Sequence, residues 1–146
     1  MQIRPLSLEG VFEIQLAPPR DERGFFCRTY DNKTFREWGM HRNWIQESLS
    51  FSKFRGTVRG MHFQHPPHSE TKLITVISGE VFFAVVDLRK DSPTFGRWTS
   101  QILSEERMNG LYVPRGCANG LCTLTDNCRL AYKMDNPYSK ENEYII

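Results

Sequence analysis

The chain has 146 residues, 39% of them hydrophobic and 25% charged, which is the balance of one globular domain with a core of its own. The net charge is only +2, and the basic residues are scattered rather than gathered in a run. Both features argue against general nucleic-acid binding and favour a small anion as ligand. The longest apolar run, 81–86, is too short to span a membrane, and residues 1–10 lack the apolar region of a secretory signal, so we expect a cytoplasmic protein.

The first third of the chain contains the only helical pattern. Residues 11–16 alternate apolar and polar side chains, which is typical of a strand, and residues 25–30 are a second short strand candidate. Residues 32–38 predict a short helix, with Asn32 as its possible N-cap and Gly39 as its end.

From Trp44 onwards the pattern is rich in β-strands. Residues 73–77 and 81–88 flank Ser78-Gly79, a hairpin signal in which glycine supplies a positive φ. Further strands are predicted at 98–103, 111–113, 121–124 and 129–134, with turns at 114–116 and 125–127. Many short strands with almost no helix indicate an all-β antiparallel sandwich or barrel, and we predict a cupin-like jelly roll that forms one domain over residues 1–146.

The four cysteines give no sign of a disulfide framework or a metal site. They lie at positions 27, 117, 122 and 128, and no two of them form a CxxC pair. Because so few cysteines do not make a disulfide scaffold, we expect free thiols that are buried or half-buried.

A jelly roll with several histidines raises the possibility of a metal-binding cupin. The candidates are His62, His65 and His68, with Glu70 close behind. Residues three apart on a strand point to opposite faces, so His62 and His65 could not easily share an ion. Asn119 follows the turn at 114–116, where the second sequence motif of a cupin would normally supply a histidine, and asparagine is a poor ligand for transition metals. We therefore expect no metal and no cofactor, and we predict that His65 and His68 are exposed loop residues.

Several separated motifs resemble those of the dTDP-4-dehydrorhamnose 3,5-epimerase family. They are DERGFF at 21–26, RGMHFQ at 59–64, SPTFGRW at 92–98 and LAYK at 130–133, and the resemblance extends from Val11 to Tyr144. It implies a cofactor-independent isomerase that epimerises a nucleotide-linked 4-keto-6-deoxyhexose. The nucleotide would be dTDP, with CDP or GDP as alternatives. The resemblance also implies a homodimer in which an N-terminal strand joins the partner's sheet.

The resemblance assigns three catalytic roles. His62 would be the base that removes the proton next to the ketone, and Lys72 would stabilise the enolate. Tyr132 would return a proton from the opposite face, since a phenol donates without bringing charge into the site. The residues expected to bind substrate are Arg23, Phe26, Gln46, Ser48, Arg59 and Asn119. Structural alternatives stay open: His62 as a core histidine, Tyr132 as a core or rim residue, and Arg23 as a surface charge.

Three departures from the family pattern bear on the mechanism. The chain ends at Ile146, ahead of the family segment whose aspartate pairs with the histidine, so we expect a differently tuned base, with Asp87 as one candidate replacement. Asn119 occupies the position of a family histidine and cannot shuttle a proton. Arg28 stands where the family usually has glutamate, which reverses the charge of a binding wall.

These departures keep three hypotheses open. The leading one is an epimerase that acts at C3, C5 or both. A 3,4-ketoisomerase would use the same enediol chemistry on the same class of substrate. A sugar-nucleotide-binding relative without turnover is the third.

Overall fold

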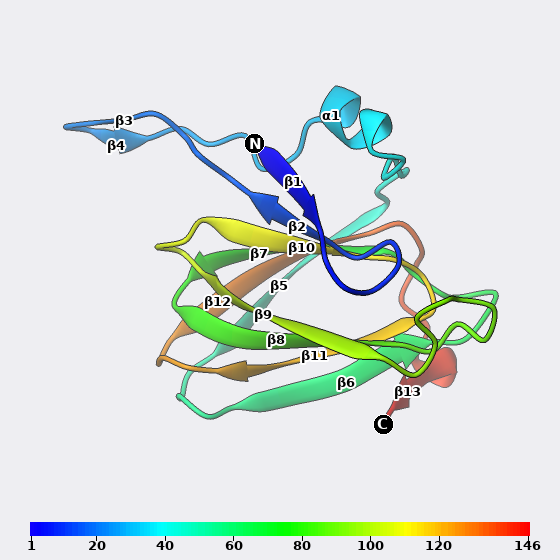
Figure 1. Ribbon diagram of the computed structural model, residues 1–146. Helices are drawn as coiled ribbons and strands as arrows, with labels where there is room; N and C mark the ends of the chain where they lie inside the picture. Colours follow the sequence, from blue (N-terminus) through cyan, green and yellow to red (C-terminus); the bar gives the residue numbers. More distant parts are fainter.

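Two antiparallel sheets packed face to face make up most of the chain in the computed structural model, which describes residues 1–146 (Figure 1). The six-stranded sheet has the order β1 (Gln2–Pro5), β2 (Phe12–Gln15), β10 (Asn109–Val113), β7 (Lys72–Ser78), β12 (Cys128–Met134) and β5 (Gln46–Ser52). The five-stranded sheet has the order β13 (Glu143–Ile145), β6 (Val58–Gln64), β11 (Cys117–Thr123), β8 (Glu80–Asp87) and β9 (Trp98–Ser104). The predicted all-β sandwich is therefore confirmed.

The core lies between the sheets because alternate residues of each strand point inward. In β8, for example, Val81, Phe83 and Val85 are buried in the main apolar cluster. Neighbouring residues Ile74 and Leu73 of β7 show the alternation, since Ile74 belongs to this cluster and Leu73 to a second one.

The second cluster covers part of the outer face of the six-stranded sheet. Its centre is the segment around helix α1 (Asn32–Glu37), where Phe35 and Met40 are buried. Ile14 of β2 and the adjoining Leu16 pack into the same cluster, so the apolar N-terminal strand is covered within the chain itself. None of the helices has the length and apolarity needed to cross a lipid bilayer.

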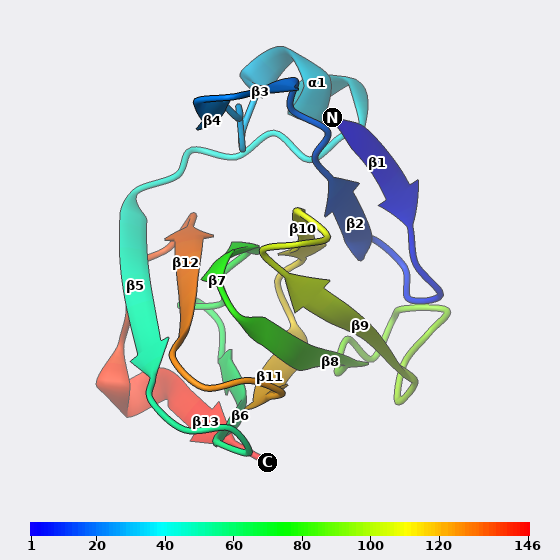
Figure 2. The same cartoon turned by 90° about the vertical axis from the view of Figure 1, so that its left-hand side faces the viewer.

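A small hairpin stands apart from the sandwich. It consists of β3 (Arg20–Asp21) and β4 (Gly24–Phe25) and projects from the end of the molecule opposite β6 and β13 (Figures 1 and 2). Phe25 of β4 and the following Phe26 are exposed.

The predicted elements agree with the structure except near the N-terminal third. The strand predicted at 25–30 is wrong, because pairing stops at Phe25 and the chain continues without strand structure towards α1. Asp31, rather than Asn32, caps the helix, since its carboxylate accepts a hydrogen bond from the Thr34 amide at 2.9 Å. The predicted burial of the cysteines is confirmed, with Cys117 and Cys128 buried and the other two half-buried.

Candidate active site

A cavity of about 180 Å³ opens between the two sheets and gathers most of the predicted residues. Its lining consists of Arg59, His62, Lys72, Phe83, Asn119, Gly120, Leu121 and Tyr132. His62 comes from β6 of the five-stranded sheet, whereas Lys72 of β7 and Tyr132 of β12 come from the six-stranded sheet. The predicted base and the predicted acid therefore lie on opposite walls of one cavity.

Two glycines allow β6 and β11 to approach closely beside His62. A Cβ on Gly60 would lie 2.7 Å from the Asn119 carbonyl oxygen and 2.7 Å from the Gly120 Cα, and the φ of Gly60 is +106°. A Cβ on Gly120 would lie 2.9 Å from the Arg59 carbonyl oxygen. No side chain fits at either position without moving a strand, so this contact fixes the backbone that carries His62.

Asn119 is part of the same contact. Its register partner on β6 is His62, and its side-chain amide donates a hydrogen bond to the His62 carbonyl oxygen at 3.1 Å. The side chain is buried. Asn119 thus braces the strand under the histidine while it lines the cavity.

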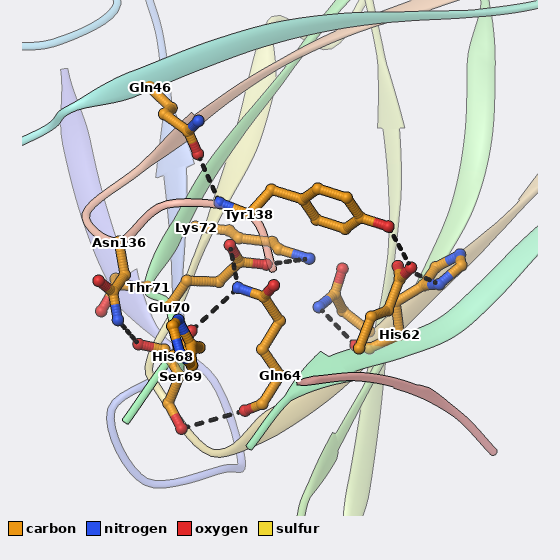
Figure 3. Close-up of polar contacts among 12 residues, drawn as sticks. Gln46, His62, Gln64, His68, Ser69, Glu70, Thr71, Lys72, Asn136 and Tyr138 are labelled. Carbon is orange, nitrogen blue, oxygen red and sulfur yellow. Dashed lines mark hydrogen bonds and ion pairs between the residues drawn. The ribbon is translucent and has the colours of Figure 1, made fainter. Parts of the chain in front are cut away.

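The imidazole of His62 faces a carboxylate that sequence reasoning missed. Its Nδ1 lies 3.2 Å from Glu143 Oε1, a distance suited to an ion pair, although the N–H direction is not aligned for a hydrogen bond. The other carboxylate oxygen, Oε2, accepts a hydrogen bond from the Tyr138 hydroxyl at 2.8 Å (Figure 3). His62 Nδ1 is buried, whereas Nε2 has no partner in the chain and is not buried.

Asp87 does not pair with His62. It is fully buried at the end of β8, where its carboxylate accepts hydrogen bonds from Arg89, Ser92 and Thr94. Burial alone would raise the pKa of Asp87, but these hydrogen bonds outweigh it and hold the pKa well below its usual value. The candidate replacement named from the sequence is therefore wrong: Asp87 ties the loop after β8 to the sheet, and Glu143 is the carboxylate beside the histidine.

Lys72 also has a carboxylate partner. Its ammonium lies 3.0 Å from Glu70 Oε1, and the two side chains are only 14% and 9% exposed. The second oxygen of Glu70 accepts a hydrogen bond from the Gln64 side-chain amide at 3.0 Å (Figure 3). The lysine is thus held in place by a mostly buried ion pair.

Tyr132 and Arg59 complete the cavity. Burial raises the pKa of Tyr132, and Ser50 and the Arg59 charge only partly oppose this effect, so the phenol keeps its proton at neutral pH. Arg59 is tethered to β5, because its guanidinium donates to Ser52 Oγ at 2.9 Å and to the Phe51 carbonyl oxygen at 3.0 Å. The cavity therefore carries positive charge at its rim and a neutral proton donor on one wall.

Two predicted binding residues on β5 lie beside the cavity without lining it. Ser48 is the register partner of Tyr132. Gln46 accepts a hydrogen bond from the Tyr138 backbone amide at 2.8 Å, so within the chain it supports the segment that carries Tyr138 and Glu143 (Figure 3).

Arg23 and Phe26 do not reach the cavity of their own chain. They lie on and next to the projecting hairpin, where the Arg23 side chain is 85% exposed and Phe26 is 84% exposed. Arg23 pairs with Asp21 at 2.7 Å. Arg28 lines a separate hollow of about 490 Å³ beside the helix.

The histidines after β6 do not gather. No three His, Cys, Asp or Glu side chains come together in an arrangement that could hold a metal ion. His65 is exposed, as predicted, and its ring packs edge-on against Tyr144 with 4.4 Å between centroids. His68 is half-buried rather than exposed, and its carbonyl oxygen accepts a hydrogen bond from the Gln64 side-chain amide.

Comparison with known proteins gives a consistent result. Residues 5–146 match the profile of the dTDP-4-dehydrorhamnose 3,5-epimerase family. The enzyme of that name from Shigella flexneri is 43% identical over 124 residues, which are 84% of this chain and 68% of the relative. The Bacillus anthracis enzyme, crystallised with TDP and PPi bound, superposes with a TM-score of 0.96 at 36% identity and covers 99% of this chain and 83% of its own. A 3′-monoepimerase from Streptomyces bikiniensis in complex with dTDP-quinovose superposes with a TM-score of 0.90 at 30% identity, covering 97% and 72%.

Proposed function

The chain belongs to the dTDP-4-dehydrorhamnose 3,5-epimerase family and is an epimerase of dTDP-linked 4-keto-6-deoxyhexoses, and we propose that His62, Lys72 and Tyr132 carry out its proton transfers. One observation supports these roles. The three side chains line a single cavity, with His62 on one sheet and Tyr132 on the facing sheet. Inversion at carbon needs a base and an acid on opposite faces of the sugar ring, which two facing sheets supply.

The reaction begins at the carbon next to the C4 ketone. His62 Nε2, which has no partner within the chain, takes the proton, and the electron pair moves onto the ketone oxygen as an enolate. The Lys72 ammonium stabilises this oxyanion. The Tyr132 hydroxyl then returns a proton to the opposite face of the same carbon, which inverts it.

The diphosphate of the substrate would lie at the cationic rim. Arg59 is exposed there, and its tether to β5 orients the guanidinium without neutralising it, since both of its partners are uncharged. Asn119 and the two residues on β5, Gln46 and Ser48, would contribute polar contacts to the sugar or the nucleotide. A dTDP-linked substrate is the first choice because the Bacillus anthracis relative binds TDP.

A homodimer would bring the remaining predicted residues into use. Arg23 and Phe26 are exposed on and next to the β3–β4 hairpin, which projects away from the two sheets (Figure 1), and neither lines the cavity of the same chain, so they could contact substrate only in a partner's site. The outer face of the six-stranded sheet also exposes Leu49, Phe51 and Ile77, an apolar surface that a partner could cover. Light scattering at micromolar concentration tests this proposal, and the mass of a single chain would reject it.

Proton NMR in D₂O with freshly made dTDP-4-keto-6-deoxyglucose tests the catalytic roles. We expect loss of the signal at C3, at C5 or at both, and His62→Asn should slow this exchange about 10² to 10⁴-fold while dTDP affinity is retained. His41→Asn, at an exposed histidine beside Asn32, is the control and should exchange like the wild type.

The same spectra separate the competing hypotheses. Exchange at one carbon indicates a mono-epimerase, and a product with its ketone at C3 indicates a ketoisomerase. Nucleotide binding without any exchange would reject the catalytic proposal in favour of a sugar-nucleotide-binding protein.

A further inference from the structure

We propose that Glu143 is the positioning residue for His62: its carboxylate holds the Nδ1 edge of the imidazole so that Nε2 faces the cavity ready to accept a proton. The inference builds on the proposed role of His62 as the base. It starts from the 3.2 Å separation between His62 Nδ1 and Glu143 Oε1.

The pairing of β13 with β6 places Glu143 beside His62. In the β13–β6 register, Ile145 is the partner of His62 and Glu143 is the partner of Gln64, two residues further along. Residues two apart on a strand share a face, so Glu143 is the diagonal neighbour of His62 and is long enough to reach it. Backbone hydrogen bonds on both sides fix the register, from the His65 amide to the Asn142 carbonyl at 3.0 Å and from the Ile146 amide to the Met61 carbonyl at 3.1 Å.

The carboxylate is itself held in place. Tyr138 donates to Glu143 Oε2, which leaves Oε1 for the histidine. The segment that carries Tyr138 is tied to both sheets, because its amide donates to Gln46 on β5 and the next amide, of Ser139, donates to Gln64 on β6 at 2.6 Å. Glu143 therefore belongs to a fixed network rather than to a mobile tail.

The chemistry of a carboxylate explains what this contact does. An ionised carboxylate can only accept a hydrogen bond, so it favours the tautomer with the proton on Nδ1 and leaves the lone pair on Nε2. When Nε2 takes the substrate proton, the imidazolium forms next to a negative charge that balances it. A small rotation of the ring would align the N–H with Oε1, because the two atoms are already 3.2 Å apart.

Glu143→Gln tests the inference, since glutamine keeps the size and the acceptor for Tyr138 but presents an amide N–H that favours the wrong tautomer. We expect kcat to fall about 10 to 100-fold with KM changed less than about twofold. Glu143→Asp should recover part of the loss. Glu141→Gln, at an exposed glutamate two residues away, is the matched control and should behave as the wild type.

Two further measurements distinguish positioning from other roles. Nitrogen-15 NMR of the His62 ring should show the Nδ1–H tautomer in the wild type and a shift towards Nε2–H in Glu143→Gln. In a His62→Asn background, Glu143→Gln should cause no further loss. A raised KM with an unchanged kcat, or an unchanged tautomer, would overturn the inference and make Glu143 a substrate contact or a structural residue.

The failure of this inference can be told apart from failure of the proposed function. If His62→Asn abolishes exchange while Glu143→Gln is harmless, only the role of Glu143 is rejected. If His62→Asn itself retains full exchange, the proposed base is wrong and the role of Glu143 falls with it.

Discussion

Replacing Lys72 with methionine should lower both activity and stability, and the two effects have separable causes. The ammonium is the proposed partner of the enolate, so its loss should cost about 10² to 10³ in kcat, the cost of removing one oxyanion donor. The stability effect comes from Glu70, which would remain buried without its counter-charge.

The geometry sets the size of the stability effect. At 3.0 Å and an effective dielectric constant of about 20, two unit charges attract each other by roughly 5 kcal/mol, most of which is offset by desolvation. Removing one partner of such a buried pair typically costs about 3 to 5 kcal/mol. The hydrogen bond from Gln64 remains on Glu70, so we expect the lower end, about 3 kcal/mol.

Urea denaturation followed by circular dichroism measures this free energy. The double variant Lys72→Met/Glu70→Gln should recover at least about 2 kcal/mol of the loss, because it removes the stranded charge, yet it should stay as inactive as Lys72→Met. Lys133→Met is the control, since Lys133 forms an exposed ion pair with Glu47 on the same sheet and should cost less than about 1 kcal/mol.

Two results would refute this reasoning. A double variant as unstable as Lys72→Met would show that the stranded carboxylate is not the cause. Full exchange activity in Lys72→Met would show that the lysine does not stabilise the enolate.

Three further predictions concern the proposed acid Tyr132, the loop after β8 and the contact between β6 and β11. Tyr132→Phe should slow epimerisation about 10² to 10⁴-fold without weakening dTDP binding. Because burial raises the pKa of Tyr132, the alkaline limb of the wild-type pH–rate profile should lie above the pKa of free tyrosine, near 10. An alkaline limb below about pH 9 would contradict this prediction. The pKa of Asp87 is lowered on folding, so its contribution to stability is present above the unfolded-state pKa near 3.8 and is lost as pH falls towards the folded value. In urea titrations, the stability of Asp87→Asn should therefore depend less on pH over this range than that of the wild type. The same pH dependence in both proteins would contradict this prediction. Gly60→Ala should lower the free energy of unfolding by about 3 kcal/mol, since its Cβ would collide with the backbone of β11, and a loss under about 1 kcal/mol would show that the strands can separate freely.

The sequence predicted the sandwich because many short strand-like runs are separated by turns and almost no helix interrupts them. It did not show which residues face the core in β8, since residues 81–86 are continuously apolar and only the structure shows that Val81, Phe83 and Val85 are the buried ones. The strand predicted at 25–30 failed because pairing stops at Phe25, and both Phe25 and the following Phe26 are exposed rather than packed against a sheet. Local pattern does not say whether an apolar residue faces the chain's own core.

The sequence motifs predicted the polar residues that line the cavity, but they did not predict the two carboxylates that contact His62 and Lys72. His62, Lys72 and Tyr132 stand out because their residue types suit proton transfer and enolate stabilisation. Glu70 and Glu143 depend on distances that sequence spacing does not encode. Glu143 is 81 residues from His62 and meets it only through the pairing of β13 with β6. A prediction of that pairing would have been the one signal able to find it.

Because the proposed base and the proposed acid lie on different sheets, the apolar core between the sheets would influence which substrate fits. Stacked sheets lie about 10 Å apart, and the side chains that fill the space between them determine that separation. Phe83 and Leu121, the two apolar side chains among the lining residues from β8 and β11, would therefore help to set the space between His62 and Tyr132. Changing their bulk would change which ring substituents fit between the two groups, so these buried positions offer a route to altered sugar selectivity that leaves every polar group in place.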